Sequence, residues 1–289
     1  MKTFGMSKIN VLITGSDGTL GIELKRNLSS KLNCLYLNKK NFNLLNYKQM
    51  FKICSDFNPN YIINTSAYTN TIKAEKNKKL SYKTNFLGVK NLYLISKKFK
   101  FKLIHFSTDY VFDGKRTRPY SEIDITNPKN YYGKTKELAD NYLIKKYLKN
   151  TIILRVSLLY SMHGSNILTD VLKQLNSKKQ LRYVSDVICS PTSAKSLASF
   201  CNKLILLNKF QYGLYNFTDN QHCSRYEFVD YIRKELGFKN KIFKISSYEL
   251  SQNLNRPKYS VLDNSKIKRK FEIRLFSWKT NLKRLLNNK

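Results

Sequence analysis

The first half of the chain alternates short apolar runs with longer stretches in which apolar residues recur with helical spacing. The apolar runs that we expect to form buried strands are residues 9–14, 34–37, 61–64, 103–107 and 152–156. The stretches with helical spacing are residues 20–32, 47–57, 80–99 and 131–147. Alternation of this kind is typical of strand-helix-strand units around a parallel sheet. The pattern therefore predicts an α/β fold with a doubly wound parallel sheet.

The second half of the chain has a looser pattern. Beyond residue 158, strand candidates at residues 181–184, 214–217 and 242–245 stand among shorter helices. No linker rich in Pro, Gly or Ser separates the two halves, so we expect them to pack together. We predict a larger region, residues 1–158, and a smaller region, residues 159–289, whose segments can interleave.

A glycine-rich turn follows the first predicted strand and opens the first predicted helix. Glycines allow the tight turn and let the backbone approach a pyrophosphate, which then lies at the helix N-terminus, where amide groups point outward. This context, a strand before and a helix after, predicts a dinucleotide-binding domain of the Rossmann type in residues 1–158. The residues that we expect to contact the cofactor there are Gly15, Ser16, Asp17, Gly18, Thr19, Leu20 and Gly21.

The end of the second predicted strand bears on the choice of cofactor. An acid at this point would bind the ribose hydroxyls of NAD, but the sequence reads Asn38-Lys39-Lys40. With no acid and two cations, the loop tolerates a 2′-phosphate, which favours NADPH, with NADH as the alternative. Asn38 and Lys39 are therefore predicted cofactor residues, although these lysines can equally be ordinary surface residues.

Composition narrows the classes of function. Among 289 residues, 53 Lys and Arg stand against 19 Asp and Glu, which gives a formal net charge of +34. The cations form no basic stripe with interleaved aromatics, so we expect no nucleic-acid binding and attribute the charge mainly to codon bias. The sequence shows no signal peptide and no apolar span of about 18 residues, so we expect no membrane association.

Cysteines and histidines give no sign of a metal site. The five cysteines lack metal-binding spacing, and several lie in apolar runs, which indicates reduced thiols. The three histidines lie far apart in the sequence, and His105 falls inside an apolar strand. We therefore expect a soluble cytoplasmic protein without a metal.

Two polar stretches contain candidate catalytic residues. The stretch HFSTDYVFDG, residues 105–114, ends the fourth predicted strand, and the C-terminal end of such a strand faces the ligand crevice. In NYYGKTKEL, residues 130–138, Tyr132 and Lys136 stand four apart, so the ammonium can favour the ionised phenol. Such pairs are also common on solvated helix faces. Together with a hydroxyl from the strand end, they predict a triad of Thr108, Tyr132 and Lys136.

The motifs in combination resemble one family. The chain is similar to the extended short-chain dehydrogenase/reductases, and within them to the dTDP-4-dehydrorhamnose reductases. The motifs that carry the resemblance are Thr14-Gly15-x-x-Gly18-x-x-Gly21, STDYVFDG, YSEIDITNPKNYYGKTKELAD and SPTSA, with NTSAYT, LRVSLLY and RPKYSVLD extending it over the whole chain.

The resemblance implies NADPH-dependent reduction of the 4-keto group of a nucleotide-linked 6-deoxy sugar, dTDP-4-dehydro-L-rhamnose to dTDP-L-rhamnose. Tyr132 would be the general acid, Lys136 would lower its pKa and hold the nicotinamide ribose, and Thr108 would position the keto oxygen. The further cofactor residues expected are Asn64, Ser66, Ala67, Tyr68 and Asn85, the last as a support for the active-site backbone. The substrate residues expected are Thr108, Asp109, Tyr110, Ser157, Asn166, Arg256 and Tyr259, with Arg256 on the diphosphate. A homodimer is compatible with these expectations.

Two departures from the family pattern leave the exact sugar open. Thr71-Ile72 stands before Lys73-Ala74-Glu75, where the family has Val-Asp, and Leu158 replaces a family Trp. A reductase of another nucleotide-linked keto sugar, or a non-catalytic cofactor-binding regulatory subunit of the same fold, are the alternatives. A dehydratase is disfavoured, because Tyr110 follows Asp109 where elimination of water would need a second acid.

Overall fold

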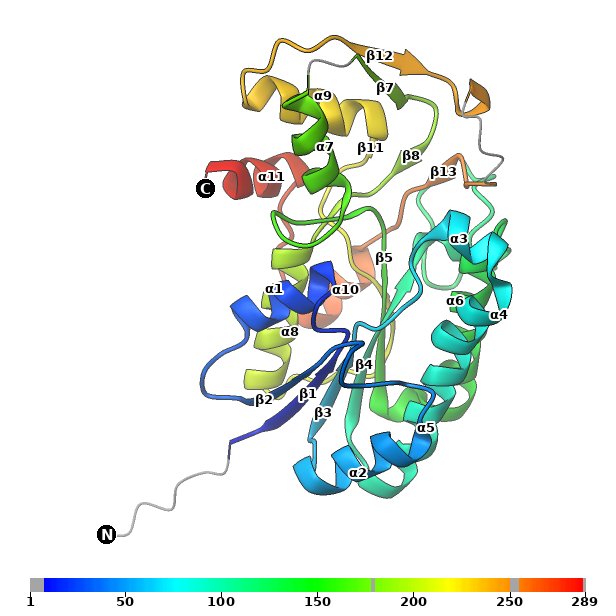
Figure 1. Ribbon diagram of the computed structural model, residues 1–289, viewed down its shortest axis with the longest axis vertical. Helices are drawn as coiled ribbons and strands as arrows, with labels where there is room; N and C mark the ends of the chain where they lie inside the picture. Colours follow the sequence, from blue (N-terminus) through cyan, green and yellow to red (C-terminus); the bar gives the residue numbers. More distant parts are fainter. Residues whose placement is uncertain (1–7, 178–179, 250–254, 288–289) are drawn as a thin grey trace.

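The computed structural model describes residues 8–177, 180–249 and 255–287. Its centre is a six-stranded sheet in the order β10-β5-β4-β3-β1-β2, and every neighbouring pair is parallel (Figure 1). The strands are β1 (Asn10–Thr14), β2 (Asn33–Leu37), β3 (Tyr61–Asn64), β4 (Lys102–Thr108), β5 (Thr151–Val156) and β10 (Gly213–Asn216). The chain runs from β1 to β2 on one side and then to β3 on the other. The predicted doubly wound Rossmann-type sheet is confirmed, with its switch point between β1 and β3.

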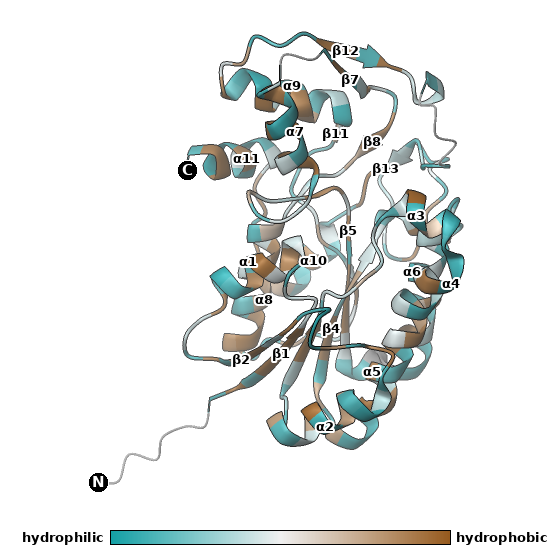
Figure 2. Ribbon diagram, in the orientation of Figure 1, coloured by the Kyte–Doolittle hydropathy of each residue, from teal (hydrophilic) through white to brown (hydrophobic). Residues whose placement is uncertain are grey.

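Helices cover both faces of this sheet (Figure 1). One layer contains α1 (Thr19–Asn27), α8 (Ala194–Leu206) and α10 (Ser265–Phe271). The other layer contains α2 (Tyr47–Phe57), α5 (Gly88–Phe99) and α6 (Tyr131–Tyr147). The central strands are accordingly mostly apolar along their length, as Figure 2 shows, because helices cover both faces of the sheet.

The predicted helix over residues 80–99 is divided in the structure. It consists of α4 (Lys78–Tyr82), a π-helical segment η1 (Lys83–Leu87) and α5. The π-helical segment contains Asn85, which is buried. Segments of this kind insert an extra residue into a helix and are frequent near functional sites.

The C-terminal region forms its own apolar core around Trp278 and Phe228. Its helices are α7 (Ile167–Leu175), α9 (Arg225–Glu235) and α11 (Trp278–Asn287). Strands β7 (Leu181–Val184) and β12 (Ile242–Ile245) pair in parallel at the ranges predicted from the sequence. The shorter elements are α3 (Thr71–Lys76), β6 (Leu159–Tyr160), β8 (Ile188–Cys189), β9 (Thr192–Ser193), β11 (Cys223–Ser224), β13 (Tyr259–Ser260), η2 (Asp109–Val111), η3 (Leu148–Asn150) and η4 (Ser247–Glu249).

Segments from beyond residue 158 also complete the sheet layer. Strand β10 pairs with β5 at the sheet edge, and α8 packs against α1. The two halves therefore interleave, and a domain boundary at residue 158 stays a prediction.

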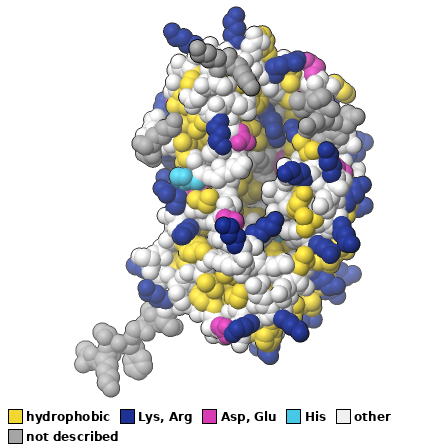
Figure 3. Space-filling view, viewed as in Figure 1, with side chains coloured by type: hydrophobic (Ala, Val, Ile, Leu, Met, Phe, Trp, Pro, Cys, Tyr) yellow, Lys and Arg dark blue, Asp and Glu magenta, His cyan; other side chains and the backbone are white. Residues whose placement is uncertain are grey.

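The surface is basic without a single cationic patch on the face shown in Figure 3, where Lys and Arg side chains are scattered between apolar and neutral ones. No helix within the described part of the chain is long and apolar enough to cross a membrane.

Candidate active site

The glycine-rich turn lies at the switch point of the sheet. Gly15 has a φ of +70°, and a Cβ on it would lie 2.8 Å from the backbone nitrogen of Ser66, which follows β3. Only glycine therefore fits where the ends of β1 and β3 meet. Helix α1 starts after Gly18, which has no side chain to cap it. Its first amide groups are left for an anion, so the turn fits the pyrophosphate of a dinucleotide.

Asn85 holds the loop that follows β3. Its Oδ1 accepts a hydrogen bond from the backbone nitrogen of Tyr68 at 2.7 Å, and its Nδ2 donates to the Tyr68 carbonyl at 3.2 Å. The same Nδ2 donates to Oγ1 of Thr135 at 2.9 Å, and that hydroxyl donates to the carbonyl of Tyr132 at 2.8 Å. Asn85 thus connects the loop of Ser66, Ala67 and Tyr68 to α6.

The loop after β2 presents its lysines to solvent. The Oδ1 of Asn38 accepts a hydrogen bond from the backbone nitrogen of Lys40 at 2.9 Å, which fixes the turn. Lys39 and Lys40 are exposed and form no ion pair with any described acid. The loop follows Leu37, whose carbonyl accepts from the amide of Ser16 in the glycine-rich turn at 3.0 Å.

The structure brings Thr108 and Tyr132 together. Thr108 ends β4, and its hydroxyl interacts with the phenol of Tyr132 in the first turn of α6. The ring of Tyr132 also meets that of Tyr110 edge to face, with centroids 6.0 Å apart. A Cβ on Gly133 would lie 2.1 Å from the carbonyl oxygen of Tyr110, so a glycine is needed for α6 to come this close to η2. Two of the three predicted catalytic side chains therefore converge.

Lys136 has a different setting from the one predicted. Its Nζ lies 3.2 Å from Nε2 of His105 in β4, and its side chain is 2% exposed. The expected lowering of the Tyr132 pKa by Lys136 is not found in this geometry. Burial instead raises the pKa of Tyr132, while the hydrogen bond with Thr108 opposes that rise and Asp109 adds to it. Burial also lowers the pKa of Lys136 to about 8, against the attraction of Asp140.

Asp109 collects hydroxyl groups from three segments. Its Oδ2 accepts from Ser157 at 2.7 Å and from Ser260 at 2.6 Å, and its Oδ1 accepts from Thr108 at 3.1 Å. Burial raises the pKa of Asp109, and these hydrogen bonds oppose the rise. All four side chains are at most 5% exposed. Asp109 and Ser157, predicted to contact substrate, thus form a buried scaffold that orients Thr108 and ties β13 to β4.

Two arginines act electrostatically on Tyr110. Burial lowers the pKa of Arg256, as does the like charge of Arg225, while both arginines act on the phenol of Tyr110. The buried Nε of Arg256 has no hydrogen-bond partner, and neither arginine forms an ion pair with a described acid. Tyr259 follows in β13 and is half-buried. Two neighbouring cations without an acidic partner suit an anionic group, and Arg is the side chain best shaped to bind phosphate.

Comparisons with known proteins agree with this geometry. Residues 9–289 match the family described as RmlD substrate binding domain. The chain belongs to the dTDP-4-dehydrorhamnose reductase family. It is similar to spore coat polysaccharide biosynthesis protein SpsK of Bacillus subtilis (35% identity; 96% of this chain, 97% of that protein) and to dTDP-4-dehydrorhamnose reductase of Aggregatibacter actinomycetemcomitans (32%; 95% and 97%). The structure resembles the dTDP-4-dehydrorhamnose reductase of Bacillus anthracis in complex with NADP, with a TM-score of 0.93 and 30% identity (98% of this chain, 100% of that chain).

The two departures from the family pattern are Thr71-Ile72, which begin α3, and Leu158. Leu158 lies between β5 and β6 with a φ of +38° and packs against the C-terminal core. Glu75, in α3, accepts a hydrogen bond from the backbone nitrogen of Tyr131 at 2.6 Å. An acid at the N-terminus of a helix is stabilising, so the retained Glu75 holds the catalytic helix even though the preceding family acid is absent.

Asn166 does not join the expected substrate residues. Its Oδ1 accepts from the backbone nitrogen of Leu168 at 3.0 Å, and its Nδ2 donates to the carbonyl of His163 at 2.9 Å. The side chain thus forms the N-cap of α7. We therefore leave Asn166 out of the substrate site proposed below.

Three residues of the site were missed by the sequence analysis. Arg225 is one cation among 53 Lys and Arg, and nothing in its local sequence distinguishes it. Glu75 was read only as part of a family motif. His105 was interpreted as a core or surface histidine, and it is buried, yet it contacts Lys136. The signal available for His105 was a polar residue inside an apolar strand, three residues before the strand ends.

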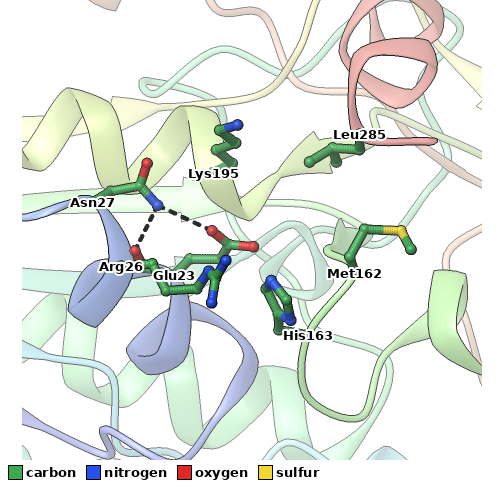
Figure 4. Close-up of a pocket in the computed structure, with 7 residues that line it drawn as sticks. All are labelled: Glu23, Arg26, Asn27, Met162, His163, Lys195 and Leu285. Carbon is green, nitrogen blue, oxygen red and sulfur yellow. Dashed lines mark hydrogen bonds between the residues drawn. The ribbon is translucent and has the colours of Figure 1, made fainter. Parts of the chain in front are cut away.

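A pocket of about 680 Å³ lies beside α1, and none of the triad residues lines it (Figure 4). In it, Nδ2 of Asn27 donates to Oε2 of Glu23 at 3.0 Å. The lining residues are Glu23, Arg26, Asn27, Met162, His163, Lys195 and Leu285. None of them is a predicted site residue, so this pocket is distinct from the candidate active site.

Proposed function

We propose that this protein reduces the 4-keto group of a nucleotide-linked 6-deoxy sugar with NADPH, and that the substrate is dTDP-4-dehydro-L-rhamnose. The observation that carries the proposal is the convergence of the Thr108 hydroxyl and the Tyr132 phenol at the end of β4. The chain also matches named dTDP-4-dehydrorhamnose reductases over almost their full length.

The proposed cofactor site extends from the glycine-rich turn to Lys136. The amide groups at the start of α1 would bind the pyrophosphate, and Lys39 would pair with the 2′-phosphate of NADPH. The loop of Ser66, Ala67 and Tyr68, which Asn85 fixes, would lie along the cofactor. Bound NADPH supplies the hydride that reduces the carbonyl carbon.

The proposed proton transfer to the keto oxygen uses side chains of the protein. Thr108 would donate its hydroxyl hydrogen to the keto oxygen and so hold that oxygen beside Tyr132. The Thr108 hydroxyl now donates to Asp109 at 3.1 Å, so its single hydrogen would turn from Asp109 to the keto oxygen when the substrate binds. The phenol of Tyr132, whose raised pKa keeps it protonated at neutral pH, then delivers its proton to the oxygen as negative charge develops there.

The proposed substrate site lies between Tyr110 and the C-terminal region. Arg225 and Arg256 would bind the diphosphate of the sugar nucleotide, since their like charges act on one another and neither forms an ion pair with an acid among the described residues. Tyr259 would pack beside it. Asn130 ties this segment to the catalytic helix: its Nδ2 donates to the carbonyl of Asn255 at 3.1 Å, and its Oδ1 accepts from the amide of Gly133 at 2.9 Å.

The decisive experiment is to incubate the purified protein with NADPH and dTDP-4-dehydro-L-rhamnose and to follow NADPH absorbance and the sugar product. Turnover that depends on this sugar supports the proposal. Turnover only with another 4-keto sugar nucleotide would favour the second candidate, a reductase of a different sugar, which the Leu158 replacement motivates. NADPH binding without turnover of any sugar in the screen would favour a regulatory subunit.

We further propose that the reaction takes place in the cytoplasm. All five cysteines are free, and free thiols persist in a reducing compartment. The homodimer stays a prediction, which light scattering of the purified protein would test.

A further inference from the structure

A row of buried polar side chains crosses the sheet at one level and ends at Lys136. Thr14 of β1 is in register with Asn64 of β3, and Asn64 is in register with His105 of β4. These three side chains are at most 1% exposed. Buried polar groups persist in a protein interior when they are hydrogen-bonded, so the direction of each bond in the row carries information.

The orientation of the Asn64 amide is fixed by a backbone donor. The amide nitrogen of Ser66 donates to Oδ1 of Asn64 at 3.2 Å, and the hydroxyl of Thr14 donates to the same atom at 2.7 Å. A backbone N–H can only donate, so this atom is the amide oxygen. The Nδ2 of Asn64, a donor only, therefore faces Nδ1 of His105 at 3.1 Å.

This contact selects one tautomer of His105. Because Nδ1 accepts from Asn64, the single proton of the neutral imidazole is on Nε2. A second proton is disfavoured, since burial holds the pKa of His105 well below its ordinary value. His105 therefore presents an N–H group, and not a lone pair, to its neighbour.

The neighbour is Nζ of Lys136, 3.2 Å from Nε2 of His105. An N–H group can donate to the lone pair of a neutral amine but opposes an ammonium. The other charged group acting on Lys136 is Asp140, on the same helix, which favours the ammonium. Asp140 is itself engaged by Arg155 of β5, at 3.4 Å, and by the hydroxyl of Ser107 of β4, at 2.7 Å. Asp109 of η2 acts on Tyr132, a turn earlier on α6.

We propose that Asn64 and His105 are positioning residues that control the protonation of Lys136. Asn64 fixes the tautomer of His105, and the Nε2–H of His105 favours the neutral amine of Lys136 over the ammonium. When NADPH binds, the ribose hydroxyls favour the ammonium, so Nζ leaves His105 and takes one proton from the buffer. That proton can pass to Tyr132 after the phenol has protonated the keto oxygen, which returns Lys136 to His105 as an amine. The inference rests on the proposed function only in its use of NADPH.

The tautomer can be measured directly by ¹⁵N NMR of the imidazole nitrogens. The chain has three histidines, so a protein with His163→Gln and His222→Gln retains His105 as the only labelled ring. We expect a protonated Nε2 and an unprotonated Nδ1 from about pH 6 to about pH 9, without titration of the ring. A protonated Nδ1 would overturn the proposal, whatever the protein does with a sugar nucleotide.

Proton uptake tests the second half of the proposal. Calorimetric titration of the protein with NADPH at about pH 9, in two buffers of different ionisation enthalpy, should reveal uptake of up to about one proton. Lys136→Met should abolish this uptake. Uptake that is absent in the native protein, or that persists in Lys136→Met, would contradict the proposal.

Asn64→Asp is the most informative variant, because it should reverse the direction of the hydrogen bonds at His105 without removing a side chain. The carboxylate would accept from Nδ1–H of His105, so Nε2 would become an acceptor for an ammonium. The NMR signals should exchange, and NADPH binding should lose its proton uptake. A reversed tautomer with unchanged uptake would overturn the control by His105. If this variant does not fold, the NMR and calorimetric measurements on the protein with native Asn64 still test the proposal. Sugar turnover enters none of these readouts, so failure of the proposed reaction would be seen separately.

Discussion

The hydroxyl of Ser260 donates to Oδ2 of Asp109 at 2.6 Å, although the two residues are 151 positions apart in the chain. Asp109 immediately follows Thr108, and Ser260 immediately follows Tyr259 in β13. This bond therefore joins the catalytic end of the sheet to the segment that we propose to bind the sugar nucleotide. Its energetic weight should be appreciable, because both side chains are buried and a hydrogen bond to a charged group contributes about 1.5–3 kcal/mol.

Ser260→Ala should loosen that segment without touching the cofactor. We expect the free energy of unfolding to fall by about 1–3 kcal/mol and the KM for the sugar nucleotide to rise, with an unchanged Kd for NADPH. Chemical denaturation and steady-state kinetics would measure both. Ser185→Ala is a matched control, because the Ser185 hydroxyl makes only a 3.5 Å contact with the carbonyl of Ile245. Equal effects from the two variants would contradict a special role for Ser260.

The arginine pair should act on binding of the sugar nucleotide. Loss of a charge-assisted hydrogen bond worth about 1.5–3 kcal/mol predicts a rise of about 10- to 100-fold in KM for Arg225→Ala and for Arg256→Ala. NADPH affinity should stay the same. Arg182→Ala, which removes an exposed arginine paired with Glu249 at 2.8 Å, should leave KM unchanged. An unchanged KM in Arg256→Ala would remove that residue from the proposed site.

Cofactor preference should depend on the loop after β2. NADPH should bind more tightly than NADH, since its 2′-phosphate gains contacts from Lys39 and Lys40 and meets no carboxylate. Fluorescence titration of the double variant Lys39→Ala/Lys40→Ala should show that most of this preference is lost. The preference should also shrink as salt is added, because the lysines are exposed and screened. A clear preference for NADH in the native protein would contradict the assignment.

Much of the fold could be predicted because its signals are local. Parallel strands that are buried on both sides leave continuous apolar runs, so β3 was predicted with its bounds. Helices α2 and α6 were also predicted at their observed ranges, since their spacing and flanking residues are unambiguous. The π-helical segment η1 was not, because its extra residue reflects packing of Asn85 against Tyr68 and Thr135 and has no signal in the periodicity.

The site was predictable to the extent that its residues lie in short motifs. Gly15 follows β1, Thr108 ends β4 and Tyr132 lies in the first turn of α6, so the convergence of Thr108 and Tyr132 could be inferred. The contacts of Lys136 could not: helical spacing placed it near Tyr132, but the deciding partner is His105, on a strand 31 residues away in the chain. Arg225 was missed for a similar reason, since its proposed role depends on Arg256, which is distant in the sequence.

Stability should depend on pH through Asp219. Burial raises the pKa of this carboxyl to about 7, although it accepts from the hydroxyl of Tyr160 at 2.7 Å and from Asn281 at 2.8 Å. Between the ordinary value near 4 and about 7, the folded protein holds a proton that the unfolded chain releases, so stability falls as pH rises through this window. In Asp219→Asn this contribution is absent. The free energy of unfolding of the variant, relative to native protein, should therefore increase from about pH 4 to about pH 7 and then level off. A difference that is constant over this range would contradict the assignment.

The two adjacent tyrosines of α6 allow the sharpest test of the catalytic chemistry. Tyr132→Phe keeps the ring that packs on Tyr110 and loses only the hydroxyl, so the fold and NADPH affinity should persist. Turnover should fall by about 10²- to 10⁴-fold, the usual contribution of a positioned general acid. Tyr131 lies about 100° further round the helix, where its ring meets Lys78 at 5.6 Å and its backbone nitrogen donates to Glu75. Tyr131→Phe should therefore be nearly silent in steady-state kinetics. Equal losses in the two variants would mean that the phenol of Tyr132 is not the proton donor.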